Sequence, residues 1–300
     1  MNCLISKNYG MLKIALAAIV WSTQGWLVKA IPWSAISLTG LRALFVAILL
    51  ALLRKNVKWE LNKASCLGAI SVALTSTLYI AANKLTTAAN AVVLQYAMPL
   101  FVIGLTWFFR KKRPTRRDVG TVFFILTGIV LCFLSSIGTG RVAGDLLALL
   151  SAGTYSIMFF LAQNHSKDSL QFIYQGMCLC AFGIFYLPID EYFVLSGSIS
   201  LHFGLAVLVL FIGYWLFASG MKDGVNAIHA AILANLEPIL SPVLTFIMVG
   251  EQPGVLTVLG MAIVLVAVSV YSILEARSQE KKSVPEVSGS ERKEEPRYPG

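Results

Sequence analysis

The chain repeats the segment LTTAANAVVLQYAMPLFVIGLTWFFRKKRP (residues 85–114) as GVNAIHAAILANLEPILSPVLTFIMVGEQP (residues 224–253), and this repeat governs its architecture. The two segments align without a gap, so that Pro99 and Pro114 fall on Pro238 and Pro253. Apolar helices match by composition alone, and the aligned prolines are therefore the informative part. The repeat predicts a chain made of two related halves.

The loops that follow the two copies differ sharply in charge. Six Lys and Arg lie from Arg110 to Arg117 after the first copy, whereas none lies from Gly250 to Gly254 after the second. Basic residues concentrate in the cytoplasmic loops of membrane proteins. The two copies are therefore predicted to cross a membrane in opposite directions, as the inverted repeats of secondary transporters do.

The composition indicates that lipid surrounds the chain. Of its 300 residues, 57% are hydrophobic and 13% are charged, and the mean hydropathy is +0.75; a soluble domain carries about 25% charged residues. Apolar runs of about 20 residues, enough to cross a hydrocarbon core of ~30 Å, recur along the chain. We predict ten spans, at residues 11–30, 33–53, 64–84, 90–110, 118–136, 143–163, 169–189, 199–219, 226–249 and 254–274.

These spans predict an all-α fold, a polytopic membrane protein of ten transmembrane helices built as two inverted five-helix repeats. The repeats occupy residues 11–137 and 143–274, with residues 1–10 as a cytoplasmic N-terminus and residues 275–300 as a disordered cytoplasmic tail. Twenty of the 24 Lys and Arg then lie on the cytoplasmic side. This bias predicts a multi-pass protein of the cytoplasmic membrane with both termini in the cytoplasm.

Several classes of partner are disfavoured by the sequence. The formal charge of +9 resides mostly in short loops between apolar runs, because the basic and acidic residues of the tail from Glu275 onward cancel, so no nucleic-acid partner is expected. Cys178 and Cys180 diverge by about 200° on a helix, and we expect neither a disulfide nor a metal or other cofactor. No phosphate-binding glycine loop or nucleophile motif is present, which disfavours an ATP-driven pump.

Four motifs give the chain a family resemblance: VWSTQGWLVKA (20–30), LTGLRALFVAILLALLRK (38–55), GDLLALLSAGTYSIMF (144–159) and LEPILSPVLTFIMVGEQP (236–253). Through them the chain resembles the EamA-type family of the drug/metabolite transporter superfamily over residues 11–274. The resemblance implies a proton-coupled or exchange carrier, usually an exporter, of small metabolites such as amino acids or nucleobases. A channel or a non-transporting membrane receptor is the alternative, and the carrier could be a monomer or a homodimer.

Glu237 is the clearest candidate for a functional residue because it lies near the middle of the ninth predicted span, where a charged group costs at least about 2.5 kcal/mol. Asn226, His229, Glu237 and Ser241 fall within an arc of about 120° on a helix, and Pro238 can bend that helix. We expect Glu237 to bind a proton or a substrate amine with His229 nearby. The alternative is a structural glutamate.

The second span contributes the other intramembrane charge. Arg42 could hold a substrate carboxylate by paired hydrogen bonds, or it could neutralise Glu237 or a helix C-terminus. Lys29 and Lys84 lie near span ends, where a long side chain is expected to reach the lipid headgroups. Glu251 is expected to be a solvated residue at a helix end, and Asp145 an N-cap.

Polar and aromatic residues of five other spans are candidates for lining a cavity. Ser22 and Gln24 interrupt the first span, while Gln95, Tyr96 and the helix-bending Pro99 occupy the repeat positions of Ala234, Asn235 and Pro238. Because the repeat is inverted, the fourth and ninth spans should meet near the centre. Aromatic walls around a flat or amphipathic substrate are expected from Tyr155, Tyr174, Tyr214 and Trp215, which could instead be packing or interface residues.

Overall fold

A computed structural model describes residues 2–53, 62–111, 113–162, 169–223, 225, 233–234 and 236–283 of the chain. All regular structure in these residues is helical. The first half contains α1 (Asn2–Ser22), α2 (Gln24–Ala30), α3 (Ala35–Leu53), α4 (Lys63–Leu85), α5 (Ala88–Gln95), α6 (Met98–Arg110) and α7 (Arg116–Ser136). The second half contains α8 (Val142–Ala162), α9 (Ser169–Cys180), the 3₁₀ helix η1 (Ala181–Ile189), α10 (Gly197–Lys222), α12 (Leu236–Val249) and α13 (Val255–Ser283).

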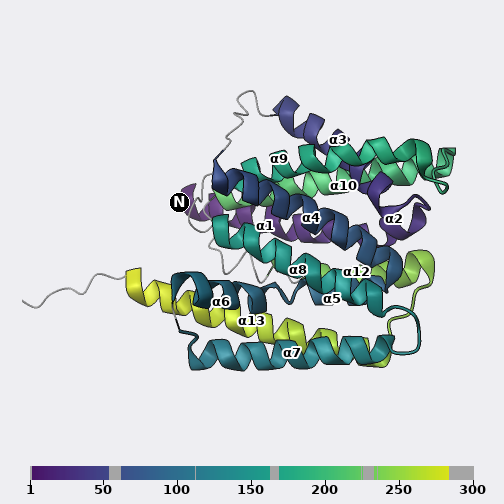
Figure 1. The fold of residues 1–300 in the computed structure, drawn as a ribbon. Coiled ribbons are helices and arrows are strands. Elements are labelled where there is room, and N and C mark those ends of the chain that lie inside the picture. Colours follow the sequence, from purple (N-terminus) through teal and green to yellow (C-terminus); the bar gives the residue numbers. More distant parts are fainter. Residues whose placement is uncertain are drawn as a thin grey trace, which may run out of the picture.

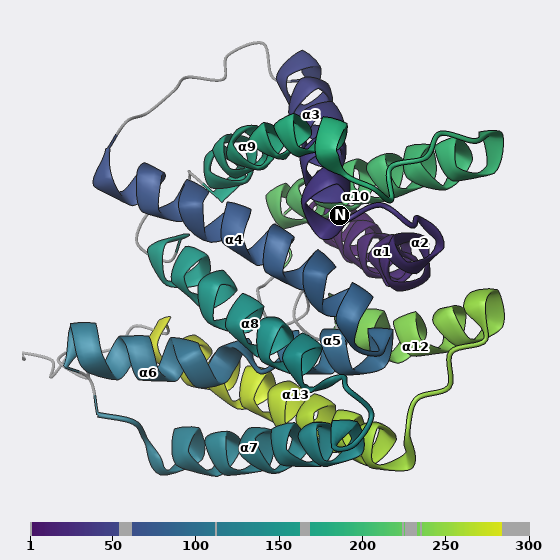
Figure 2. The same ribbon diagram turned by 45° about the vertical axis from the view of Figure 1, so that its right-hand side comes forward.

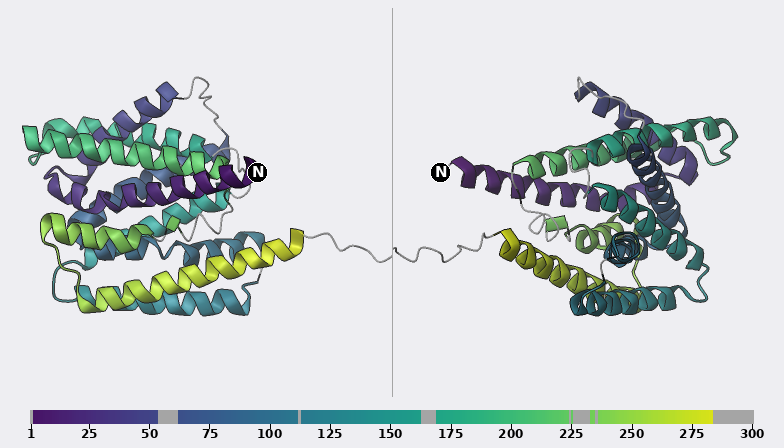
Figure 3. Two further views of the ribbon diagram at one scale, coloured as in Figure 1. Left: turned by 180° about the vertical axis from the view of Figure 1, so that it is seen from behind. Right: turned by 60° about the vertical axis from the view of Figure 1, so that its left-hand side comes forward.

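The helices run side by side along one direction, with short connections at both ends of the bundle (Figure 1). The start of α1 and the end of α13 lie at the same end, which we call the terminal end; the opposite end is the distal end (Figure 3). The first helix of the first half, α1, runs away from the terminal end, whereas the first helix of the second half, α8, runs toward it. The two halves are therefore inverted relative to each other.

The contacts between helices are those that a two-fold relation between the halves requires. Helix α1 packs on α10 as α8 packs on α4, and α12 packs on α1 and α2 as α5 and α6 pack on α8. Two further pairs, α3 with α9 and α7 with α13, join equivalent helices of the two halves. Figure 2 shows α7 and α13 together at one side of the bundle, with α4 and α8 crossing its middle.

Eight helical segments of the described residues are long and apolar enough to cross a membrane. Two shorter apolar segments, Val142–Met158 and Leu236–Val249, stand at the positions of the sixth and ninth predicted spans. The all-α fold of two inverted halves is thus confirmed. Helix α13 continues to Ser283, past residue 274 where the last predicted span ends, because a helix can extend beyond the bilayer wherever no residue stops it.

Two predicted spans of the first half, the first and the fourth, are broken near their middle. The first is interrupted at Thr23, where the hydroxyls of Ser22 and Thr23 donate to the carbonyls of Ile19 and Val20. The fourth is divided at Tyr96 and Ala97, and Pro99 lies in the first turn of α6. Proline is tolerated in a first helical turn, where its missing N–H has no partner to lose, so Pro99 marks a new helix and not a smooth bend.

Candidate functional site

Arg42 lies in the interior of the bundle on α3, with its side chain 3% exposed. Its Nη1 donates to Oε1 of Gln24 on α2 at 3.0 Å, whereas its Nε has no hydrogen-bond partner in the described part of the chain. The two ion pairs among the described residues, Lys13–Asp223 and Lys29–Glu251, leave Arg42 out. A buried guanidinium without a paired carboxylate is costly, and an anionic ligand would remove that cost.

Glu237 stands in the first turn of α12, half-buried, and meets the break in the fourth span. The hydroxyl of Tyr96 lies 3.2 Å from Glu237 Oε2 and 2.8 Å from the carbonyl oxygen of Ala234. Tyr96 and Glu237 therefore join the two repeat segments directly, as the inverted repeat predicts. A carboxylate held by one neutral donor can accept a further hydrogen bond, from an amine or from another hydroxyl.

Three further tyrosines lie near these two charges. Tyr79 on α4 and Tyr214 on α10 are within electrostatic range of both Arg42 and Glu237, and Tyr155 on α8 is within range of Glu237. Together with Arg42, Gln24, Tyr96 and Glu237 they form what we call the central cluster. A cation and a carboxylate with tyrosines nearby suit an amphipathic ligand that carries both charges.

The central cluster lies near mid-membrane depth. Tyr96 is eight residues from the distal start of α5, and Glu237 is twelve residues from the distal end of α12. At about 1.5 Å per residue these separations are about 12 and 18 Å, and half of a ~30 Å hydrocarbon core is about 15 Å. Transporters with inverted repeats place their substrate site at this depth between the halves.

The other predicted site residues lie in several different surroundings. Ser22 is fully buried but bonds its own helix, Gln95 is half-buried, and Pro238 is buried in the first turn of α12. Trp215 is 51% exposed on the outside of the bundle, so its side chain does not face the central cluster. Asn226 and His229 lie outside the described residues.

Ser241 is one turn beyond Glu237 on α12 and marks a close approach between helices. Its side chain is 1% exposed, and its Oγ has no hydrogen-bond partner among the described residues. A Cβ added at Gly25 of α2 would lie 2.9 Å from that Oγ. Only glycine at position 25 permits this contact, which closes the space between α2 and α12.

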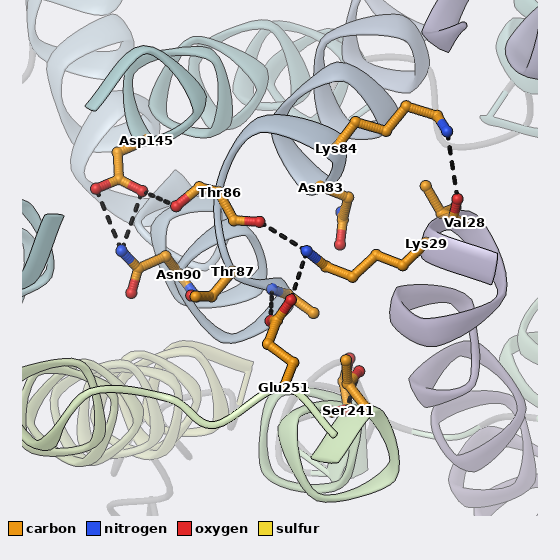
Figure 4. A network of polar contacts seen from close by, with 12 residues as sticks. Val28, Lys29, Asn83, Lys84, Thr86, Thr87, Asn90, Asp145, Ser241 and Glu251 are labelled. Carbon is orange, nitrogen blue, oxygen red and sulfur yellow. Dashed lines mark hydrogen bonds and ion pairs between the residues drawn. The ribbon is translucent and has the colours of Figure 1, made fainter. Parts of the chain in front are cut away.

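Polar side chains tie the distal end of the bundle together (Figure 4). Lys29 at the end of α2 forms an ion pair with Glu251 and donates to the carbonyl of Thr86 at 2.8 Å. Glu251 also accepts from the N–H of Ala88, the first residue of α5, at 2.6 Å. The predictions of a solvated Glu251 and a lipid-reaching Lys29 are therefore wrong, because each charge finds its partner inside the protein.

Lys84 likewise turns inward, contrary to prediction, and donates to the carbonyl of Ile31 at 2.8 Å. Asp145 is fully buried on α8 and does not cap that helix; it accepts from the hydroxyl of Thr86 and the amide of Asn90. Asn90 in turn accepts from Thr257 of α13 at 2.7 Å. One buried asparagine thus links α5, α8 and α13, which identifies it as a junction of the distal end.

The start of α3 is fixed by Asp190, which follows η1. Its carboxylate accepts from the backbone N–H of Ser34 at 3.0 Å and of Tyr192 at 3.1 Å. Burial raises the pKa of the Asp190 carboxyl, but hydrogen bonds from Ser37, Ser34 and Tyr192 outweigh it, so that the pKa lies below its ordinary value. Asp190 is therefore held as a carboxylate at the distal end.

The two equivalent half-helices α6 and α12 are packed differently. Helix α12 buries Pro238, Ser241, Pro242 and Thr245 against its neighbours, whereas α6 buries no residue. A Cβ added at Gly153 of α8 would lie 3.6 Å from the Phe101 ring of α6, so that approach is looser than the one at Gly25. The bundle is therefore closed more tightly between α12 and α2, toward the distal end, than between α6 and α8.

Comparison with known proteins agrees with this arrangement. The model of the EamA-like transporter family matches the chain twice, over residues 8–134 and 142–273. This chain belongs to the EamA-like transporter family. The two matched segments are the two inverted halves, and as an EamA-like transporter the chain is a multi-pass membrane protein. Within the described residues no group of three or more His, Cys, Asp or Glu side chains could hold a metal ion.

Two relatives of this EamA-like chain are also named as transporters. An uncharacterized transporter of Archaeoglobus fulgidus is 28% identical over 87% of this chain and 95% of the relative. The uncharacterized inner membrane transporter YicL of Salmonella typhimurium is 26% identical over 89% of this chain and 96% of the relative. A crystal structure with 19% identity matches with a TM-score of 0.59, covering 90% of this chain and 99% of the other, and it supports the fold alone.

Proposed function

We propose that this EamA-like transporter is a secondary carrier that exports small amphipathic metabolites, such as amino acids, across the cytoplasmic membrane. The observation that carries the proposal is Arg42, a buried guanidinium whose Nε lacks a partner and which no acidic side chain of the described residues neutralises. A substrate carboxylate would supply the missing charge and hydrogen bond.

The opposite side of the central cluster suits the other half of such a substrate. Glu237 accepts one hydrogen bond from Tyr96, which leaves acceptor positions for a protonated amine. The same carboxylate could take up a proton, so that substrate and proton, or two substrates in exchange, would compete for it. We propose this competition as the coupling step, with Glu237 changing its proton or its partner between states.

The unequal packing of the two halves supports a mechanism of alternating access. The contact of α12 with α2 and the ion pair of Lys29 with Glu251 close the distal end, whereas α6 packs loosely on α8. Exchanging these two packings between the halves would open the distal end and close the terminal end. The basic loop from Arg110 to Arg117 lies at the terminal end, and we propose by charge bias that this end and both termini face the cytoplasm.

Counterflow in proteoliposomes tests this function. Vesicles loaded with one amino acid should accumulate the same labelled amino acid transiently, a result that a channel or a non-transporting receptor cannot give. Arg42→Lys keeps the charge but loses the planar guanidinium that can donate two parallel hydrogen bonds to a carboxylate. It should therefore weaken transport of zwitterionic or acidic substrates more than transport of neutral ones. The control is Arg141→Lys at the exposed distal end. Equal losses for all substrate classes would contradict a carboxylate-binding role.

A further inference from the structure

A groove of about 510 Å³ runs between α6 and α8, on the side where α6 buries no residue. Phe101, Gly104 and Phe108 line it on α6, and Leu150, Gly153 and Ile157 line it on α8. Phe108 and Leu150 are 69% and 57% exposed, so the groove opens to the surface that faces lipid. Figure 2 shows the two helices that form its walls.

The groove has the length of one lipid leaflet. Its lining on α6 runs from Leu100 to Phe109, nine residue steps along a helix. At about 1.5 Å per residue the groove is about 14 Å long, close to the ~15 Å half-thickness of a hydrocarbon core. Its surface is almost entirely apolar, which suits a hydrocarbon chain and not a polar metabolite.

Two cations stand at the terminal end of the groove. The Arg110 guanidinium carbon lies 4.8 Å from the centroid of the Phe160 ring, and Lys111 Nζ lies 5.5 Å from the centroid of the Phe108 ring. Phe108 itself lines the groove, and Lys111 adopts a left-handed conformation (φ 54°) that ends α6 there. Positive charge therefore begins where the apolar groove ends, at the level expected for lipid headgroups.

We propose that this groove is a binding site for an anionic phospholipid. One acyl chain lies between α6 and α8, and the headgroup phosphate is bound by Arg110 and Lys111. The apolar groove is followed by two basic residues, and an anionic phospholipid likewise has an apolar chain followed by a negatively charged headgroup. The inference does not depend on the identity of the substrate proposed above, because the lining of the groove includes no charged residue and no residue of the central cluster.

Thermal unfolding and native mass spectrometry of the purified chain in neutral detergent test the site. Phosphatidylglycerol should raise the melting temperature and remain bound at a stoichiometry of one, whereas phosphatidylcholine with the same acyl chains should do so far more weakly. Free glycerol phosphate should have no effect, because it lacks the chain that occupies the groove. An equal effect of phosphatidylcholine would show that an acyl chain fills the groove without any recognition of the anionic headgroup, and it would overturn the proposal.

Two variant pairs separate this site from general charge attraction. Arg110→Gln with Lys111→Gln should weaken phosphatidylglycerol binding about 30-fold, at about 1 kcal/mol for each basic residue and 1.4 kcal/mol per tenfold. The control, Arg113→Gln with Arg116→Gln, removes the same charge from the same loop and should change binding much less. Equal losses in both variants would replace the proposed site with a diffuse electrostatic attraction.

The acyl-chain half of the site is tested on Gly104, where an added Cβ meets nothing within 4 Å. Gly104→Leu should fill the groove and abolish the shift by phosphatidylglycerol without unfolding the protein. The matched control is Gly204→Leu on α10, where an added Cβ also meets nothing within 4 Å. Retained binding in Gly104→Leu would show that the lipid does not enter the groove and would overturn the proposal.

Discussion

Replacing Glu251 with Gln should loosen the closed distal end. One carboxylate oxygen of Glu251 pairs with Lys29 at the end of α2, and the other accepts from the N–H of Ala88 at the start of α5. The side chain thus holds the connection that follows α12 against two helices of the other half. Gln has the same shape and can still accept from Ala88, but it removes the charge that binds Lys29.

The size of the effect follows from the surroundings of the pair. The side chains of Lys29 and Glu251 are both 18% exposed, so solvent screens them only in part. A hydrogen bond to a charged group contributes about 1.5–3 kcal/mol. The hydrogen bond from Ala88 that Gln retains offsets part of the loss. A loss of about 1.5 kcal/mol shifts the balance between the closed and open distal end about tenfold toward the open state.

The exposure of Ser241 reports this balance, because its side chain is 1% exposed beneath the contact of α12 with α2. Ser241→Cys, placed in a chain without its native cysteines, should react slowly with an impermeant thiol reagent applied from the distal side. Adding Glu251→Gln should raise the labelling rate about tenfold. Glu191→Gln, the same change at an exposed residue of the same end, is the control.

Two results would refute this reasoning. A labelling rate of Ser241→Cys that Glu251→Gln leaves unchanged would mean that the ion pair does not hold the distal end closed. An equal increase in the Glu191→Gln control would mean that lost surface charge, and not the contact with Lys29, changes the rate.

Three other perturbations have defined outcomes. Asn90→Leu should lower the free energy of unfolding by about 1–3 kcal/mol, measured by thermal unfolding, because it leaves Asp145 buried with fewer donors; an unchanged melting temperature would contradict its role as a junction. Folding depresses the pKa of Asp190, so its contribution is complete above the unfolded pKa of about 3.9 and is lost as the pH falls through the folded pKa. Asp190→Asn should therefore destabilise the protein at neutral pH and reduce the difference in stability between neutral pH and about pH 3. Tyr96→Phe should weaken substrate binding about tenfold in a binding titration, by loss of the hydroxyl that orients Glu237; wild-type affinity would argue against that role.

The architecture was predictable because an internal repeat and the charges of the loops extend over long stretches of the sequence. Aligned prolines and the charge difference between two loops indicate inverted halves, and the structure places Tyr96 of one copy against Glu237 of the other. Pro99, which lies just beyond the break at Tyr96, was the sequence signal for that break.

The distal network was not predictable from span assignment. Lys29 and Glu251 each lie near a helix end, where a charge can reach solvent at little cost, and only the packing of α12 on α2 brings them together. Asp145 was expected to be an N-cap and Asn90 was not singled out, although a polar residue in an apolar span needs a partner. Which partner it takes depends on helices distant in sequence, and a single chain does not reveal that pairing. Trp215 failed as a site residue because an aromatic side chain suits a lipid-facing surface equally well.

The most direct test of the central cluster is ligand-induced thermal stabilisation of the purified protein across a panel of amino acids, nucleobases and vitamins. The panel should be repeated with Glu237→Gln and with Glu191→Gln as a control of the same chemistry at an exposed site. A ligand that stabilises the wild type and the Glu191 variant, but not the Glu237 variant, is the result expected if Glu237 binds the substrate. Equal stabilisation of all three proteins would contradict that assignment.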